Sequence, residues 1–371
     1  MDSNTDEDGG VKKKKNRVLD FSKYPERRIA ILFQYLGWEF DGMVSQPGNE
    51  NTTEYALLST MERIKLIRNK EYAKWNRCGR TDKNVSGFRQ VGSCIVRSTD
   101  INGKFILNHN LPPGVRILAW APVDPEFNAR YNCTQRAYSY IFPQANFDIQ
   151  QMRQACNLLV GLHDFRNICQ IDCSDDRLNT TYERQIFLAE INQMSADEHN
   201  PVNSMFQLKI RGSGFLWHQI RFIVSLLVEI GSGNEEPTLI SELLDIQKNP
   251  ARPQYTMAKD LPLCFFDCLY NEEMNWIFDL NVLKDVYLTL QKMWIEMRTK
   301  AEQIKLMMNQ IEIMAQPNQI DDITDGMTQF IRDRRPPANY VPIMKRPLCD
   351  TLEERKAKAI NKKKLRLETD S

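Results

Sequence analysis

Hydrophobic and polar positions divide the chain into two similar series of predicted elements. From residue 28 the pattern indicates a buried strand, an amphipathic helix, two strands, a short helix and a fourth strand. A second series begins near residue 124 and again alternates strands with helices. Each series fits a split βαβ unit. The predicted strands are 28–38, 71–78, 90–97, 115–123, 135–142, 184–192, 205–212 and 263–270, and the predicted helices are 52–67, 103–111, 149–165, 215–231 and 238–247.

A long amphipathic helix is predicted after these two series. Its apolar side chains recur at alternating spacings of four and three, which places them on one face. We expect this face to pack on the protein's own body, with contact to another molecule as the alternative. The residues of this face are Val286, Leu290, Met293, Met297, Ala301, Ile304, Met308 and Ile311.

The pattern gives five segments. We expect a disordered polar and basic tail, an N-terminal domain, a C-terminal domain, a long helix, and an extended, partly disordered basic tail. These segments cover residues 1–26, 27–123, 124–280, 281–315 and 316–371.

Charge and composition leave a nucleic-acid partner open. The net charge of the 371 residues is +1, so only local basic clusters can favour such a partner. One cluster, Lys12–Lys15, fits a nuclear address, a phosphate-attracting arm or a solubilising tail equally well.

The cysteines and the apolar runs exclude several classes of protein. Nine cysteines without an apolar leader favour a reducing compartment without disulfides. The pairs Cys169/Cys173 and Cys264/Cys268 lack the spacing of a zinc motif, so we expect no metal site. No apolar run approaches about 18 residues, so no membrane span is expected. Motifs for nucleotide cofactors and for serine hydrolases are also absent from the sequence, and we expect no cofactor.

The segment "RCGRTDKNVSGF", residues 77–88, is the first candidate for chemistry. Arg80 and Asp82 share a tight polar loop after a predicted strand, where the arginine would keep the carboxylate ionised. Such a carboxylate can act as a general base or as a nucleophile. Asn84 tolerates a positive φ and predicts a sharply bent loop. A surface ion pair without chemistry is the alternative.

The segment "FNARYNCTQRAYSYIF" is the second candidate. Alternation in a strand places Arg136 and Tyr138 on one face, with Arg130 just upstream. Arginine and tyrosine together suit phosphate pairing and base stacking. The alternative is a strand whose tyrosines close a core.

Arg221 is the third candidate, because it lies in a helix that is apolar nearly all round. A buried arginine requires a partner, which could be a substrate group, an active-site aspartate or a structural acid. His218, one turn earlier, is expected to support the site rather than to act as a base.

Together these segments resemble the TruA-type tRNA pseudouridine synthases. "CGRTDKNVSGFRQV" is similar to the G-R-T-D signature of that family. "YLGWEFDGMVSQ", "LPPGVRILAWAPVDPEFNARYNCTQRAYSY" and "LVGLHDFRNICQID" resemble its eukaryotic branch, which modifies uridines 38 and 39 of the tRNA anticodon arm. The similarity extends from about Arg28 to about Leu269.

The resemblance implies both a fold and a reaction. The fold would be α+β, with two split βαβ units of the ferredoxin or RRM type joined into one mainly antiparallel sheet. Flanking helices and a C-terminal helical extension would complete it. The reaction would be isomerisation of uridine to pseudouridine without a cofactor. The resemblance also implies a homodimer that acts on tRNA, and we expect it in the nucleus and cytoplasm.

The resemblance assigns roles to individual residues. Asp82 corresponds to the catalytic aspartate, and Arg80 to the arginine that precedes it. Tyr138 would lie against the target base, and Arg221 beside the aspartate. Arg130 and Arg136 would add local basic clusters for tRNA. Where many members have glycine, this chain has Asn84. A tRNA-binding or folding factor without catalysis, on the same scaffold, is the alternative function.

Overall fold

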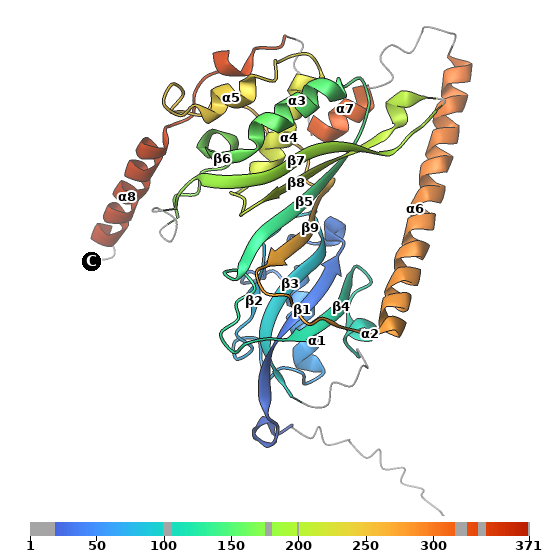
Figure 1. The fold of residues 1–371 in the computed structure, drawn as a ribbon, viewed down its shortest axis with the longest axis vertical. Helices are drawn as coiled ribbons and strands as arrows, with labels where there is room; N and C mark the ends of the chain where they lie inside the picture. Colours follow the sequence, from blue (N-terminus) through green and yellow to red (C-terminus); the bar gives the residue numbers. More distant parts are fainter. Residues whose placement is uncertain are drawn as a thin grey trace, which may run out of the picture.

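A ten-stranded, mostly antiparallel sheet with helices packed on it forms the centre of the protein (Figure 1). The computed structural model describes residues 19–98, 106–174, 180–198, 200–315, 325–332 and 339–369. The Lys12–Lys15 run, most of the predicted N-terminal tail and the start of the helix predicted at 103–111 lie outside these residues. The α+β fold with one joined sheet and a C-terminal helical extension is confirmed.

The N-terminal half places one apolar strand at its centre, with an antiparallel partner on each side. Ile29, Ile31 and Phe33 of this strand pack under a helix that Thr52 caps through its side chain. The elements of this half are β1 (Glu26–Tyr35), α1 (Thr53–Arg63), β2 (Asn76–Arg77), β3 (Ser86–Arg97), α2 (Ile106–Asn110) and β4 (Val115–Pro122).

The C-terminal half buries alternate residues of its strands under two helices. Tyr138, Tyr140 and Phe142 point into this core, as strand alternation predicts. The elements of this half are β5 (Cys133–Pro143), α3 (Ile149–Leu159), β6 (Gly161–Asp164), β7 (Glu183–Ser195), β8 (Met205–Gly212), α4 (Gln219–Gly231), α5 (Leu239–Leu244) and β9 (Leu263–Tyr270).

The two halves join through β9, which lies between β3 and β5 in the sheet (Figure 1). Its pairing with β3 is parallel, with Ser86 opposite Cys264 and Gly87 opposite Phe265. Its pairing with β5 is antiparallel. This insertion brings the end of the 77–88 segment against the C-terminal half.

Several predicted elements are shorter than expected, and the strand at 71–78 and the helix at 149–165 differ most. The strand predicted at 71–78 contains only β2, because turns with Lys74 at φ +46° precede it. The helix predicted at 149–165 ends at Leu159, because Val160 is extended and Gly161 has φ +125°. His163 therefore lies on β6 and not at a helix end.

Helix α6 (Leu280–Met314) follows a two-residue strand, β10 (Ile277–Phe278), that pairs with β4. It runs beside the sheet along the length of the molecule (Figure 1). Val286 is its buried residue, and Val282, Leu283 and Leu290 are partly buried against the core. Met297, Ile304, Met308 and Ile311 remain 44–59% exposed. Among the described residues, the prediction that this apolar face packs on the protein's own body is thus right for the first turns of the helix only.

The chain after α6 is not simply extended, which corrects the expectation for 316–371. Two helices, α7 (Asp325–Arg332) and α8 (Leu352–Thr369), lie within it. Ile331 of α7 and Leu352 of α8 are buried against the C-terminal half. These apolar contacts hold both helices on the sheet domain. In the described part of the chain, no helix combines the length and apolar character that a membrane crossing needs.

Candidate active site

The loop between β2 and β3 carries Asp82, and backbone contacts hold its beginning. The Cys78 amide donates to the Val91 carbonyl at 2.8 Å. The Gln90 side chain accepts from the Gly79 amide and donates to the Gly79 carbonyl, at 3.1 and 3.3 Å. A Cβ on Gly79 would lie 2.8 Å from the Phe265 ring of β9, so only glycine fits this approach.

The turn itself is fixed by both halves of the sheet. The hydroxyls of Thr81 and Tyr35 are hydrogen-bonded at 2.8 Å beneath it. Asn84 has φ +63°, which confirms the predicted left-handed position. Its side-chain amide donates to Asp260 of the C-terminal half at 3.4 Å. Asp82 therefore projects from a loop whose path is determined on both sides.

Asp82 faces His218, the residue directly before α4. The carboxylate Oδ2 lies 3.4 Å from His218 Nε2, and the two side chains are 38% and 15% exposed. His218 has φ +59°, a left-handed conformation that turns the chain into α4. Asp82 thus combines access from solvent with a polar partner from the other half.

His218 is neutral at neutral pH. Burial lowers the pKa of its imidazole, and this effect outweighs the Asp82 charge, which raises it. The nearby Arg221 charge lowers the pKa further. Arg221 is 8% exposed, and its Nε donates to the Ala258 carbonyl at 2.8 Å. The structure therefore brings Arg221 close to the Asp82–His218 pair, while its guanidinium is anchored on backbone.

Tyr138 of β5 is the aromatic residue of this group. Burial raises the pKa of its phenol, and the Asp82 charge raises it further, so the phenol is neutral and close enough to feel that charge. The ring is 8% exposed and contacts Phe215 and Phe265 edge to face, with centroids at 5.1 and 5.2 Å. The alternative prediction, that this tyrosine closes a core, is also correct.

The three other predicted arginines have two different placements. The Arg136 guanidinium donates to the carbonyls of Cys78, Arg130 and Ser213, at 3.3, 2.7 and 3.0 Å. It therefore binds the start of the catalytic-loop candidate and does not point toward a phosphate. Arg80 and Arg130 are exposed, and Arg130 lies 5.5 Å from the ring centre of Tyr131.

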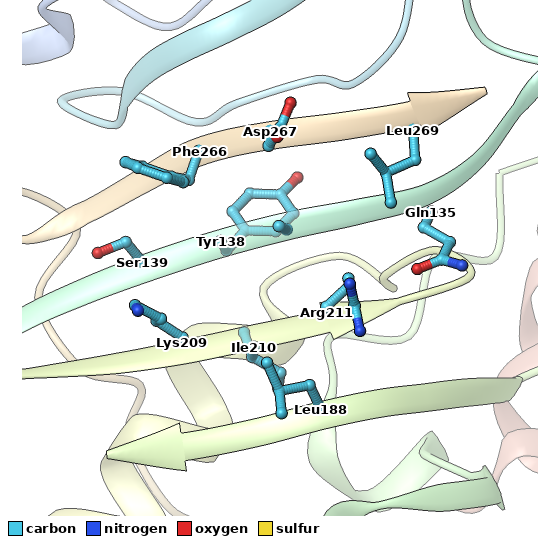
Figure 2. Close-up of a pocket in the computed structure, with 11 residues that line it drawn as sticks. Gln135, Tyr138, Ser139, Leu188, Lys209, Ile210, Arg211, Phe266, Asp267 and Leu269 are labelled. Carbon is cyan, nitrogen blue, oxygen red and sulfur yellow. The ribbon is translucent and has the colours of Figure 1, made fainter. Parts of the chain in front are cut away.

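A separate cavity of about 190 Å³ is lined by residues of β5, β7, β8 and β9 (Figure 2). Among the described residues, its lining includes Tyr138 but neither Asp82 nor His218. We therefore place the candidate site at Asp82 and not in this cavity. The residues that line the cavity are Gln135, Ala137, Tyr138, Ser139, Leu188, Lys209, Ile210, Arg211, Phe266, Asp267 and Leu269.

Two residues of the site were not predicted as contacts of the loop. His218 could be noticed because it lies one turn before Arg221, but its contact with Asp82 depends on how α4 enters the sheet. Asp260, which accepts from Asn84, lies in a coil before β9 and carries no pattern that sequence reasoning could use.

Comparisons with known proteins identify the family of this chain. The sequence model of the tRNA pseudouridine synthase family matches residues 155–271. A Caenorhabditis elegans protein, tag-124, that is named as a tRNA pseudouridine synthase is 41% identical over 97% of this chain and 96% of its own length. The Homo sapiens tRNA pseudouridine(38/39) synthase is 35% identical over 95% of this chain and 81% of its length. The Saccharomyces cerevisiae protein of that name is 37% identical over 71% of this chain and 62% of its length.

Identity at this level over nearly full lengths decides between the two functions that the sequence left open. The non-catalytic factor has no support, since the relatives are named as enzymes. The chain belongs to the tRNA pseudouridine synthase family, and it is an isomerase that converts uridine to pseudouridine in tRNA.

Proposed function

We propose that Asp82 is the catalytic carboxylate and that the enzyme modifies uridines 38 and 39 of the tRNA anticodon arm. The observation that carries the role of Asp82 is its position in a fixed loop, 38% exposed and 3.4 Å from His218. The target positions are supported by the names of the human and yeast relatives.

Asp82 would act at the sugar of the extruded uridine. The bond between N1 and the ribose carbon breaks, the uracil turns, a bond from that carbon to C5 forms, the C5 proton leaves, and N1 takes up a proton. The aspartate can promote this rearrangement by covalent attack or by removing a proton from the sugar. No donor group or redox partner is needed for the atoms to balance.

The neighbouring residues would then divide into two kinds. Tyr138 would lie against the extruded base, supported by the Asp82 charge, which raises the pKa of its phenol after burial does. Arg221, His218 and Arg136 would position the loop, since their polar groups face Ala258, Asp82 and Cys78. Arg80 and Arg130, which are exposed, would hold phosphates and help to offset the few kcal/mol that base extrusion costs.

The target positions are tested with anticodon stem-loop transcripts. Uridine is kept at position 38, at position 39, at both or at neither, with cytidine as the replacement. Site-resolved carbodiimide mapping should find pseudouridine only where a uridine is kept. Modification of the transcript that has cytidine at both positions would contradict the proposed targets.

We also propose that the enzyme is a homodimer in which α6 pairs with α6 of a second copy. The alternating four and three spacing from Met297 to Ile311 is that of a coiled-coil seam, and these apolar side chains are exposed. The same helix carries charges of both signs, such as Glu296 and Lys300, so two copies can face each other without repulsion.

Light scattering in solution tests the dimer. Wild-type protein should have twice the mass of the chain, and Ile304→Glu with Met308→Glu should give the monomer with unchanged melting. Thr299→Glu, on the same helix outside the apolar face, is the matched control and should remain dimeric. A monomeric wild type, or a dimer that survives both substitutions, would contradict this pairing.

We propose that the enzyme works in the nucleus and cytoplasm. The Lys12–Lys15 run supports nuclear entry, and the free state of all nine cysteines suits reducing compartments. Imaging of a tagged full chain should find it in both places, and replacing the four lysines with alanine should shift it toward the cytoplasm. An unchanged nuclear signal in that variant would contradict a role of Lys12–Lys15 in nuclear entry.

A further inference from the structure

Three cysteines from distant parts of the chain meet behind the Asp82 loop. Cys78 follows β2, Cys133 begins β5, and Cys268 lies on β9. Their sulfur atoms all lie within 4.8 Å of one another, and the residues are 2%, 8% and 7% exposed. The spacing of these cysteines along the sequence does not predict this group, because it forms only where β9 inserts between the two halves.

The geometry of the three sulfurs is close to that of a thiolate metal site. Sulfur ligands about 2.3 Å from a tetrahedral zinc ion lie about 3.8 Å apart, so small rotations of the side chains would bring them into range. The Tyr270 hydroxyl closes the fourth side, 4.0 Å from Cys268 Sγ. It donates to the Ala129 carbonyl at 2.8 Å and so lines this side of the three sulfurs.

The surrounding charge favours a divalent ion. Three thiolates and one divalent cation carry a net charge of −1, which a single neighbouring cation would balance. Arg136 is that cation, since its guanidinium bonds to the carbonyls of Cys78 and Cys133, at 3.3 and 3.5 Å. A monovalent ion would leave one buried negative charge without compensation, which is unfavourable.

We infer that Cys78, Cys133 and Cys268 form a structural site for a thiophilic divalent metal ion of the zinc class. Soft sulfur ligands select this class over magnesium or calcium. The ion would tie the start of the Asp82 loop to β5 and β9, and so fasten the two halves of the sheet together. It is buried away from the solvent side of Asp82, so its role is to hold the loop and not to contact the uridine.

Cobalt titration of the full-length protein tests this inference. The chain is purified under reducing conditions, stripped with a chelator and titrated with Co²⁺ while the thiolate charge-transfer and visible bands are recorded. We expect one equivalent of Co²⁺, displacement by Zn²⁺, and a higher melting temperature with either ion. Metal analysis of protein that was never exposed to chelator should find close to one zinc per chain.

Variants separate the cluster from the other thiols. Cys78→Ser, Cys133→Ser and Cys268→Ser should each weaken Co²⁺ binding by at least about 100-fold and abolish the metal-induced rise in melting temperature. Cys156→Ser is the matched control, because this residue is equally buried but lies outside the cluster, and it should bind as wild type does.

The result does not depend on the proposed catalytic residue or on the dimer, because it is read from metal binding and not from pseudouridine. If folded wild-type protein gives no thiolate band with Co²⁺, the inference is wrong. It is equally wrong if binding survives in the three variants, whatever their activity. Should a variant fail to fold, the wild-type titration and metal analysis decide alone.

Discussion

The two halves of the sheet contribute different groups to the space around Asp82. The N-terminal half supplies the carboxylate, on a loop between two of its strands, with Thr81 and Tyr35 hydrogen-bonded beneath it. The C-terminal half supplies His218 and Arg221, from the start of α4, and places Tyr138 from β5 nearby. In the proposed function, one half therefore carries the reactive group, and the other carries the groups that orient it.

The same contrast appears in how each half holds its residues. The loop of the N-terminal half is held by close backbone approaches, such as Gly79 against Phe265. The residues of the C-terminal half are held by burial and by single hydrogen bonds to backbone, as at Arg221. Because β9 joins them, a change in either half is expected to reach Asp82, but with different consequences for chemistry and for stability.

Removal of the charge on Asp82 is expected to have the largest effect. Asp82→Asn preserves the shape of the side chain but removes the base or nucleophile, so kcat should fall by at least about 1000-fold while tRNA binding stays within about twofold. Single-turnover assays and filter binding measure the two. Glu71→Gln, at an exposed carboxylate of this half, is the control and should stay active. If binding and activity were lost together, Asp82 would be needed for substrate binding and not for the chemical step.

Filling the close approach between Gly87 and the Tyr35 ring, beneath the loop, is expected to have the next largest effect. A Cβ at Gly87 would lie 2.4 Å from the Tyr35 ring, which is itself buried and bonded to Thr81. Gly87→Ala should lower the free energy of unfolding by about 1–3 kcal/mol and reduce kcat, because the ring must move under the loop. Urea denaturation measures the first and initial rates the second. Gly114→Ala, where the nearest atom lies at 3.6 Å, should change neither.

A change at Arg221 probes the orienting role of the C-terminal half. Arg221→Lys keeps the charge but loses the Nε hydrogen bond to Ala258, so we expect about 1–2 kcal/mol lower stability and about tenfold lower kcat at unchanged KM. The matched control is Arg153→Lys, whose Nε also donates to a backbone carbonyl, of Ile191 at 3.0 Å. It should lose similar stability without losing kcat. If kcat fell equally in both variants, Arg221 would have no orienting role beyond its contribution to stability.

The smallest effect concerns the protonation of His218. Burial lowers the pKa of His218 in the folded state. As the pH falls below the unfolded value of about 6.5, the unfolded chain therefore takes up a proton before the folded chain does. His218 therefore contributes stability above that pH, and the contribution is lost as the pH falls toward the folded pKa, at most about 1.4 kcal/mol per pH unit. His218→Gln should flatten this slope between pH 7 and 5. A steeper slope in the variant would mean that the folded state protonates His218 readily and pairs it with Asp82.

Several features could be predicted from the sequence because local patterns determine them. Strand alternation placed Tyr138 and Tyr140 in a core, and the apolar surface of 215–231 predicted a buried helix. Asn84 was predicted at positive φ because few other residues accept it. The short β2 and the early end of α3 were mispredicted, since turns at Lys74 and Gly161 override the apolar pattern around them.

The apolar face of α6 shows the limit of such patterns. The spacing determined the helix and its face, but among the described residues only the first turns of that apolar face pack against the core. Periodicity specifies which side chains share a face, whereas what covers that face depends on where the helix lies in space.

The sequence by itself determined the elements and the family, and it singled out Asp82 as the candidate carboxylate, because these depend on periodicity and on motifs within a few residues. Tertiary structure decided the rest. The contact of His218 with Asp82 and the meeting of Cys78, Cys133 and Cys268 join residues more than fifty positions apart. They exist because β9 inserts between β3 and β5, and strand order in a sheet is set by the packing of the whole chain and not by any local segment.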